Sequence, residues 1–222
     1  MTIFQQAIRQ HTSILATVEK RALIHIAERL PKWLNSDHLT GLGFVSLVAA
    51  GASYWLSKWY PPMLLAVIVC LALNWFGDSL DGTLARVRNR QRPRYGFYVD
   101  HILDAFGMAF LVFGMTLSGL LTPLIAFLFL IAYLLLSIEI YLATYTLGTF
   151  HLSYWRFGPT ELRILLAIGN LAALRSPYSI IAGHKFLLFD LGFAVGAAAV
   201  ALIAVQAAVR HTRQLYQEET LD

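Results

Sequence analysis

Hydrophobic residues fall into six long runs along the chain, and short segments with proline, glycine or charged residues separate them. A membrane-spanning helix needs about 20 predominantly apolar residues. The runs therefore predict six transmembrane helices, at residues 40–58, 61–85, 96–118, 120–147, 159–175 and 186–209. Helix-breaking residues mark the connections, among them Pro61, Pro62 and Pro159.

The first 35 residues differ from these runs, because charged residues interrupt every apolar stretch and no cleavable signal peptide is expected. Apolar residues recur there at helical spacing: Leu15, Val18, Ala22, Ile26 and Leu30. The polar residues off this stripe are Glu19, Lys20, Glu28 and Arg29. The pattern predicts an amphipathic helix that lies at the membrane interface or packs on the protein's own spans.

The expected fold is therefore an all-α integral membrane protein, with six transmembrane helices and an N-terminal amphipathic interfacial helix. Residues 1–39 would form the interfacial segment, 40–209 one six-helix domain and 210–222 a cytoplasmic tail. Composition agrees, since 58% of the residues are hydrophobic and only 14% are charged. The one cysteine, Cys70, supports neither an intrachain disulfide nor a zinc site.

Basic residues predict the orientation, because loops rich in Lys and Arg stay in the cytoplasm. With both termini inside, only Lys58, Arg175 and Lys185 of the 17 Lys and Arg residues lie outside. The connection between the second and third spans, with its five arginines, is then cytoplasmic. This topology accounts for much of the net charge of +4, so no nucleic-acid partner is expected.

Four aspartates lie in two pairs in the second and third spans. At about 100° per residue, Asp78 and Asp81 share one helix face, and Asp100 and Asp104 lie one turn apart on the next helix. An ionised aspartate at mid-bilayer costs about 2.5–3.5 kcal/mol, so these carboxylates need a partner. A divalent cation would relieve their repulsion. Carboxylate oxygens without His or Cys at ligand spacing favour Mg²⁺ or Mn²⁺.

Small and basic residues accompany the carboxylates. Gly82 and Ala85 lie near the face of the first pair, and Gly96 precedes Asp100 by one turn. Their small side chains leave space for a phosphate or a nucleobase to approach the backbone. Arginines can clamp phosphate oxygens, although those of this connection are also explained by topology. Together these residues indicate a phosphoryl or pyrophosphate site.

The spacing of these residues resembles the signature of the CDP-alcohol phosphatidyltransferases. It reads Asp78-x2-Asp81-Gly82-x2-Ala85-Arg86, nine residues, then Gly96-x3-Asp100-x3-Asp104, and every fixed position matches. Residues 35–44 are similar to a second family segment, Pro-Asn-x-Leu-Thr-x-x-Gly, but Ser36 and Asp37 replace its Pro and Asn. A nucleotide contact from that Asn is therefore not carried over.

The resemblance implies a metal-dependent transfer of a phosphatidyl group from CDP-diacylglycerol to a polar alcohol, with release of CMP. Two divalent cations, Mg²⁺ or Mn²⁺, would bind Asp78, Asp81, Asp100 and Asp104, and Asp104 would be the base. The CDP moiety would bind at Asp78, Gly82, Ala85, Arg86 and Gly96. The lipid tails would lie between the spans, and the polar acceptor remains unidentified.

Other polar residues are open to two interpretations. Arg156, Glu161 and Arg163 are candidates for acceptor contacts, and Glu161 and Arg163 alternatively pair with each other. Glu139, inside the fourth span, makes a structural hydrogen bond or belongs to the site. His101 lies about 100° from the carboxylate face and is expected to pack or to support the site rather than act as the base.

Three other functions stay open at this stage. In an aminoalcohol phosphotransferase, CDP would carry the small head group and diacylglycerol would attack. A transporter would spread its carboxylates along a path rather than cluster them, and an inactive scaffold would have no need of the whole motif. A homodimer is also considered, since the pairs Gly41–Gly43 and Gly192–Gly196 are compatible with close helix contacts.

Overall fold

The structure, a computed structural model, describes residues 8–10, 16–151 and 158–219. Its helices are α1 (Ala16–Arg29), α2 (Ser36–Ser57), α3 (Met63–Val87), α4 (Pro93–Ser118), α5 (Pro123–Leu147), α6 (Pro159–Arg175) and α7 (Leu188–Glu218). Two short strands, β1 (Ile8–Gln10) and β2 (Thr149–His151), pair in parallel. The strands β3 (Tyr178–Ile181) and β4 (His184–Leu187) form an antiparallel hairpin.

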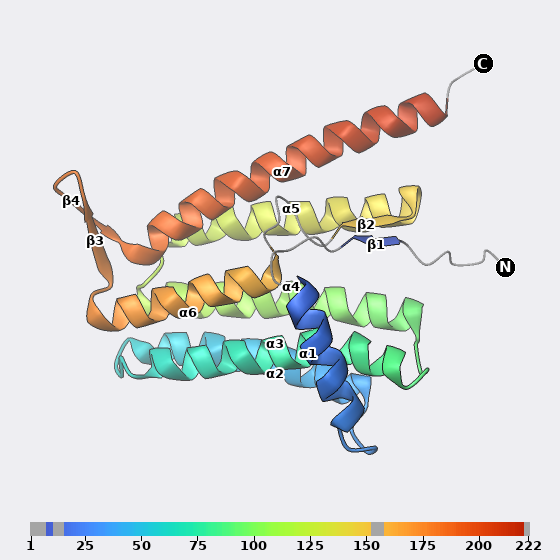
Figure 1. Cartoon of the computed structure of the whole chain (residues 1–222). Helices are drawn as coiled ribbons and strands as arrows, with labels where there is room; N and C mark the ends of the chain where they lie inside the picture. Colours follow the sequence, from blue (N-terminus) through green and yellow to red (C-terminus); the bar gives the residue numbers. More distant parts are fainter. Residues whose placement is uncertain (1–7, 11–15, 152–157, 220–222) are drawn as a thin grey trace.

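Helices α2 to α7 form at the six predicted spans and run along one another (Figure 1). Within the described residues, five of them are long and apolar enough to cross a membrane: α2, α3, α4, α5 and α7. Helix α6 has 17 residues, and at 1.5 Å per residue it is about 25 Å long, less than the hydrocarbon core of about 30 Å. The structure thus fits an all-α membrane protein, and the sixth span stays a prediction.

Residues after α6 and at the end of α7 depart from the expected boundaries. The β3–β4 hairpin was not predicted; its turn at Ala182 and Gly183 has positive φ values of 49° and 79°. Helix α7 begins after this hairpin and continues to Glu218, nine residues past the expected end. Helix formation needs no membrane, so the apolar run marks the predicted span but not the end of the helix.

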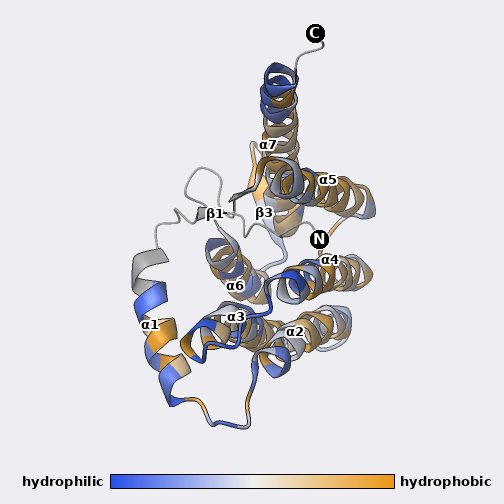
Figure 2. Ribbon diagram, turned by 90° about the vertical axis from the view of Figure 1, so that its right-hand side faces the viewer, coloured by the Kyte–Doolittle hydropathy of each residue, from blue (hydrophilic) through white to orange (hydrophobic). Residues whose placement is uncertain are grey.

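Helix α1 lies across the long helices of the bundle (Figure 1) and beside α3 (Figure 2). Its buried residues are Leu23 and Ala27, which form a cluster with Leu39 of α2 and Leu80 and Leu84 of α3. Of the predicted apolar stripe, Ile26 and Leu30 are partly buried against this cluster, whereas Ala22 is exposed and Leu23 is buried in its place. The buried face contacts the protein's own spans, which was one of the two alternatives for this helix.

Glycines bring α2 into backbone contact with both α3 and α4. A Cβ on Gly77 would lie 2.5 Å from the Leu39 carbonyl oxygen, and one on Gly114 would lie 2.0 Å from that of Gly51. Gly43 packs on α3 within the same chain, where an added Cβ would lie 3.4 Å from the backbone nitrogen of Asp78. Small residues allow such close approach between membrane helices. This packing fixes α3 and α4, which carry the aspartates, against α2.

Candidate metal and phosphoryl site

Three of the four predicted carboxylates converge between α3 and α4. Asp78, Asp100 and Asp104 each offer one oxygen within 4.8 Å of the other two. Mg²⁺ holds its ligands at about 2.0–2.1 Å, so two oxygens on opposite sides of one ion lie about 4.2 Å apart. Adjacent oxygens of the octahedron lie about 3 Å apart, so side-chain rotation within this 4.8 Å group would have to bring all three oxygens onto one ion. The carboxylates therefore fit a hard divalent cation.

Asp81 lies outside this three-residue group. Its Oδ2 accepts a hydrogen bond of 2.7 Å from the Thr40 hydroxyl, and its Oδ1 accepts one from the Gly82 backbone N–H. The Ser36 hydroxyl also donates to the backbone carbonyl of Asp81 at 2.9 Å. The start of α2 thus holds Asp81 in place. Its role as a fourth metal ligand stays a prediction.

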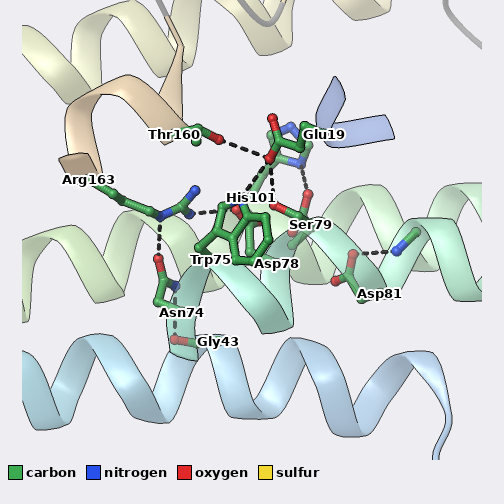
Figure 3. A network of polar contacts seen from close by, with 12 residues as sticks. Glu19, Gly43, Asn74, Trp75, Asp78, Ser79, Asp81, His101, Thr160 and Arg163 are labelled. Atoms are coloured by element: carbon green, nitrogen blue, oxygen red, sulfur yellow. Dashed lines mark hydrogen bonds and ion pairs between the residues drawn. The ribbon is translucent and has the colours of Figure 1, made fainter. Parts of the chain in front are cut away.

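Arg163 of α6 contacts the carboxylate group directly (Figure 3). Its Nη2 lies 2.6 Å from Oδ2 of Asp78, and its Nε donates to Oδ1 of Asn74 at 2.7 Å. Asn74 is buried and donates in turn to the Gly43 carbonyl at 3.0 Å. The Arg163 and Asp78 side chains are only 16% and 24% exposed, so water screens this ion pair weakly.

Glu161 caps the start of α6, whereas Arg163 pairs with Asp78. An ion pair between Glu161 and Arg163 was one of the two alternatives from the sequence. Oε2 of Glu161 accepts a hydrogen bond of 3.0 Å from the Gly158 backbone N–H, which caps the start of α6. Its Oε1 is buried and, among the described residues, has no hydrogen-bond partner. Arg156, the third candidate for acceptor contacts, lies outside the described residues.

Glu19 of α1 was expected on the polar side of its helix, but the structure places it against α3 and α6 (Figure 3). Its Oε1 accepts hydrogen bonds from Trp75, Thr160 and Ser79. The expectation placed Ala22 rather than Leu23 on the packed face, and Glu19, Leu23 and Ala27 follow one another at intervals of four residues. Helical spacing measured from Leu23 would have placed Glu19 on the packed face.

The two glycines among the predicted substrate residues have space around them. No described heavy atom lies within 4 Å of a Cβ built on Gly96, and around Gly82 only the guanidinium of Arg86 does, at 3.4 Å. Ala85 is partly buried, and Arg86 is exposed and donates to the Thr83 hydroxyl at 3.0 Å. A side chain is thus absent at two positions with space around them, and the binding of a phosphate or a nucleobase there stays a prediction.

Two arginines of the α3–α4 connection serve the fold. Arg88 donates to three backbone carbonyls of the α1–α2 connection, those of Leu30, Pro31 and Leu34. Arg92 pairs with Asp37 at the start of α2, and this hydrogen bond raises the pKa of the Arg92 guanidinium. Arg88 therefore ties this connection to the segment before α2, and Arg92 ties it to α2 itself.

His101 and Glu139 both have partners. The His101 ring stacks on Phe97 with centroids 4.2 Å apart, and its Nδ1 lies 2.7 Å from the Phe97 carbonyl oxygen and 3.8 Å from Oδ2 of Asp100. It thus packs beside a carboxylate of the group, as expected. Glu139 of α5 bonds through Oε1 to Nδ1 of His211, which is buried on α7. Glu139 therefore connects α5 with α7.

Comparison with known proteins identifies the family of this chain. The family model described as CDP-alcohol phosphatidyltransferase matches residues 33–205, well over half of the chain. The archaetidylinositol phosphate synthase of Pyrococcus horikoshii is 33% identical over 115 residues. That alignment covers 50% of this chain and 58% of the relative. With its helical bundle and clustered aspartates, this chain belongs to the CDP-alcohol phosphatidyltransferase family.

Proposed function

We propose that this protein makes a phospholipid by transferring a phosphatidyl group from CDP-diacylglycerol to a polar alcohol. The observation that carries the proposal is the convergence of Asp78, Asp100 and Asp104 beside Arg163, at the residues that resemble the family signature. Family membership supports a CDP-linked substrate. The name of the archaeal relative favours an inositol phosphate as the acceptor.

The reaction is a phosphoryl transfer that needs positioning and charge neutralisation. The acceptor hydroxyl attacks the phosphorus distal to cytidine, a new P–O bond forms, and the bond from that phosphorus to the bridging oxygen breaks. CMP leaves with the bridging oxygen, and Asp104 accepts the hydroxyl proton. Divalent cations held by the aspartates would supply neutralising charge to the phosphate oxygens.

The other site residues hold the two substrates. Open space at Gly82 and Gly96 admits the CDP moiety, and Arg86 binds a phosphate oxygen. Arg163 orients Asp78 and supplies positive charge near the transferred phosphoryl group. The acceptor binds on the side of α6, where Glu161 lies in the first turn of the helix. Asp81, held by Thr40, completes the set of carboxylates.

The test uses the purified full chain in lipid nanodiscs, with CDP-diacylglycerol and single acceptors: inositol phosphate, glycerol phosphate, serine or inositol. We expect CMP release with one acceptor, loss of release with EDTA, and recovery with excess Mg²⁺ or Mn²⁺. CDP-choline with diacylglycerol tests the aminoalcohol reaction. CMP release from that pair alone, or from no pair in the presence of metal, would contradict the proposal.

A further inference from the structure

Three hydrogen-bond donors from two helices converge on one carboxylate oxygen of the N-terminal helix. Oε1 of Glu19 lies 2.7 Å from Nε1 of Trp75, 3.0 Å from the Thr160 hydroxyl and 3.4 Å from the Ser79 hydroxyl. Trp75 and Ser79 belong to α3, and Thr160 belongs to the first turn of α6. Glu19 precedes residue 33, where the family match begins, so the match assigns it no role.

The donors stand next to the residues of the metal site. On α3, Trp75 lies three residues before Asp78 and Ser79 one residue after it. On α6, Thr160 lies one helical turn before Arg163, which pairs with Asp78. Glu19 bonds to α3 through Trp75 and to α6 through Thr160 (Figure 3). The Asp78–Arg163 pair joins α3 to α6 directly, so these contacts connect the three helices to one another.

The environment of Glu19 favours the two shorter of these hydrogen bonds, those from Trp75 and Thr160. An ionised acceptor forms shorter and stronger hydrogen bonds than a neutral one, and reduced contact with water strengthens them further. Its second oxygen, Oε2, is buried and has no hydrogen-bond partner among the described residues. Oε1 thus holds all the hydrogen bonds that the structure gives this carboxylate, and loss of Glu19 would remove its links to both α3 and α6.

We propose that Glu19 is a positioning residue, which sets the place of α6 against α3 and thereby the contact of Arg163 with Asp78. This inference rests on the proposed function, because Asp78 and Arg163 are the groups through which Glu19 acts. Through Glu19, helix α1, which lies across the bundle, would affect the site between the long helices. A purely structural Glu19 would support the fold without acting through Arg163.

The first experiment measures hydrogen–deuterium exchange of the full chain in nanodiscs, without substrate. In Glu19→Ala we expect faster exchange in peptides that cover residues 158–166. The control is Glu28→Ala, which removes an exposed carboxylate of the same helix and should leave these peptides unchanged. Equal exchange in the two variants would overturn the proposal, because α6 would then not depend on Glu19.

The second experiment measures CMP release and the Mn²⁺ concentration that gives half-maximal activity. Glu19→Ala should lower kcat about tenfold, and Glu19→Gln should recover most of it, because the amide oxygen still accepts these hydrogen bonds. Glu19→Ala and Arg163→Ala should shift half-saturating Mn²⁺ in the same direction. In the Arg163→Ala background, Glu19→Ala should cost less than about twofold. Independent, multiplicative effects would make Glu19 structural only.

Two further variants keep the test decisive if Glu19→Ala does not fold. Thr160→Val removes one donor with little change of volume, and Trp75→Phe removes another together with part of the indole. Each should give part of the exchange and kcat effects. If the wild type releases no CMP with any substrate, the proposed function fails by itself. The exchange data, with Mn²⁺ binding followed by electron paramagnetic resonance, then decide on Glu19. Unchanged exchange and Mn²⁺ binding in Glu19→Ala would overturn its positioning role.

Discussion

Asp78 has contacts of two kinds at the residue scale. Its carboxylate belongs to the three-residue group with Asp100 and Asp104, and it also bonds to Arg163 at 2.6 Å. The arginine offsets part of the negative charge that three carboxylates bring together. It also fixes the direction of one oxygen, so the group has a defined geometry.

Substitution of the aspartates separates metal binding from proton transfer. Asp78→Asn should lower CMP release at least about 10²-fold, the usual effect of removing an electrostatic group that stabilises a transition state. Asp104→Asn should lower kcat as strongly, while metal-dependent binding of the CDP substrate stays within a few-fold of wild type. Steady-state kinetics and substrate binding with Mn²⁺ measure the two effects.

Glu28→Gln is the matched control for these variants, because it neutralises an exposed carboxylate far along α1. Its kinetics should equal those of the wild type. Collapse of metal-dependent substrate binding in Asp104→Asn would make Asp104 a ligand before it is a base. Activity of Asp78→Asn above about a tenth of wild type would contradict a shared metal site.

Arg163 should not tolerate lysine. Its Nε and Nη2 bond to Asn74 and Asp78 in a fixed planar fork, whereas an ammonium on a flexible stem cannot reproduce both directions. Arg163→Lys should therefore reduce kcat/KM at least about tenfold, measured as CMP release. Arg90→Lys, in the exposed connection, is the matched control and should retain wild-type kinetics. Equal activity of the two variants would remove Arg163 from the site.

At the scale of the elements, glycine contacts set the distance between α2 and α3. Gly77 of α3 packs against α2 with no space for a Cβ. Its nearest neighbours there are the backbone atoms of Leu39 and Gly43. Backbone cannot rotate away as a side-chain tip can. Because Asp78 follows Gly77 directly, any separation of these helices also moves the metal site.

Gly77→Ala should lower the midpoint of thermal unfolding by several degrees, because its Cβ would lie 2.5 Å from the Leu39 carbonyl oxygen. Gly192→Ala is the matched control in α7, where no described heavy atom lies within 4 Å of an added Cβ. The control should be neutral or stabilising, since alanine favours a helix over glycine by about 1 kcal/mol. Thermal scans in detergent compare them; the opposite order of the midpoints would refute this packing argument.

At the scale of the whole molecule, the two ends of the bundle differ. The α3–α4 connection with its arginines and the C-terminal end of α7 lie at one end, and the α2–α3 connection and the β3–β4 hairpin lie at the other (Figure 1). Lys58 and Lys185 belong to the second end. The elements are thus separated as the positive-inside rule requires, and which end faces the cytoplasm stays a prediction.

Cysteine labelling decides the orientation. In a Cys70→Ala background, a membrane-impermeant thiol reagent should reach Arg90→Cys only from the cytoplasmic side and Lys58→Cys only from the opposite side. Arg90 and Lys58 are both exposed in the structure, so access depends on the membrane alone. Labelling of permeabilised cells controls for reactivity. The reverse pattern would invert the topology.

The sequence by itself determined the long apolar helices and the residues of the signature. Apolar runs of span length leave few alternatives to a membrane helix, and spacings of three and four residues place carboxylates on one helix face by local geometry alone. These are local properties, so no knowledge of the neighbouring helices is needed. The family match over residues 33–205 confirms the resemblance on which the site was predicted.

Only the tertiary structure decided which residues meet across helices. Arg163 meets Asp78, 85 residues away in sequence, and Glu19 meets Thr160, 141 residues away. Helical periodicity predicts neither contact, because each contact depends on which helices are neighbours and how their turns align. The same holds for Asp81, whose partner Thr40 is on another helix. Helical periodicity thus determines which side chains share a face of each helix. Packing through glycines and buried polar contacts determines which of these faces meet to form one site.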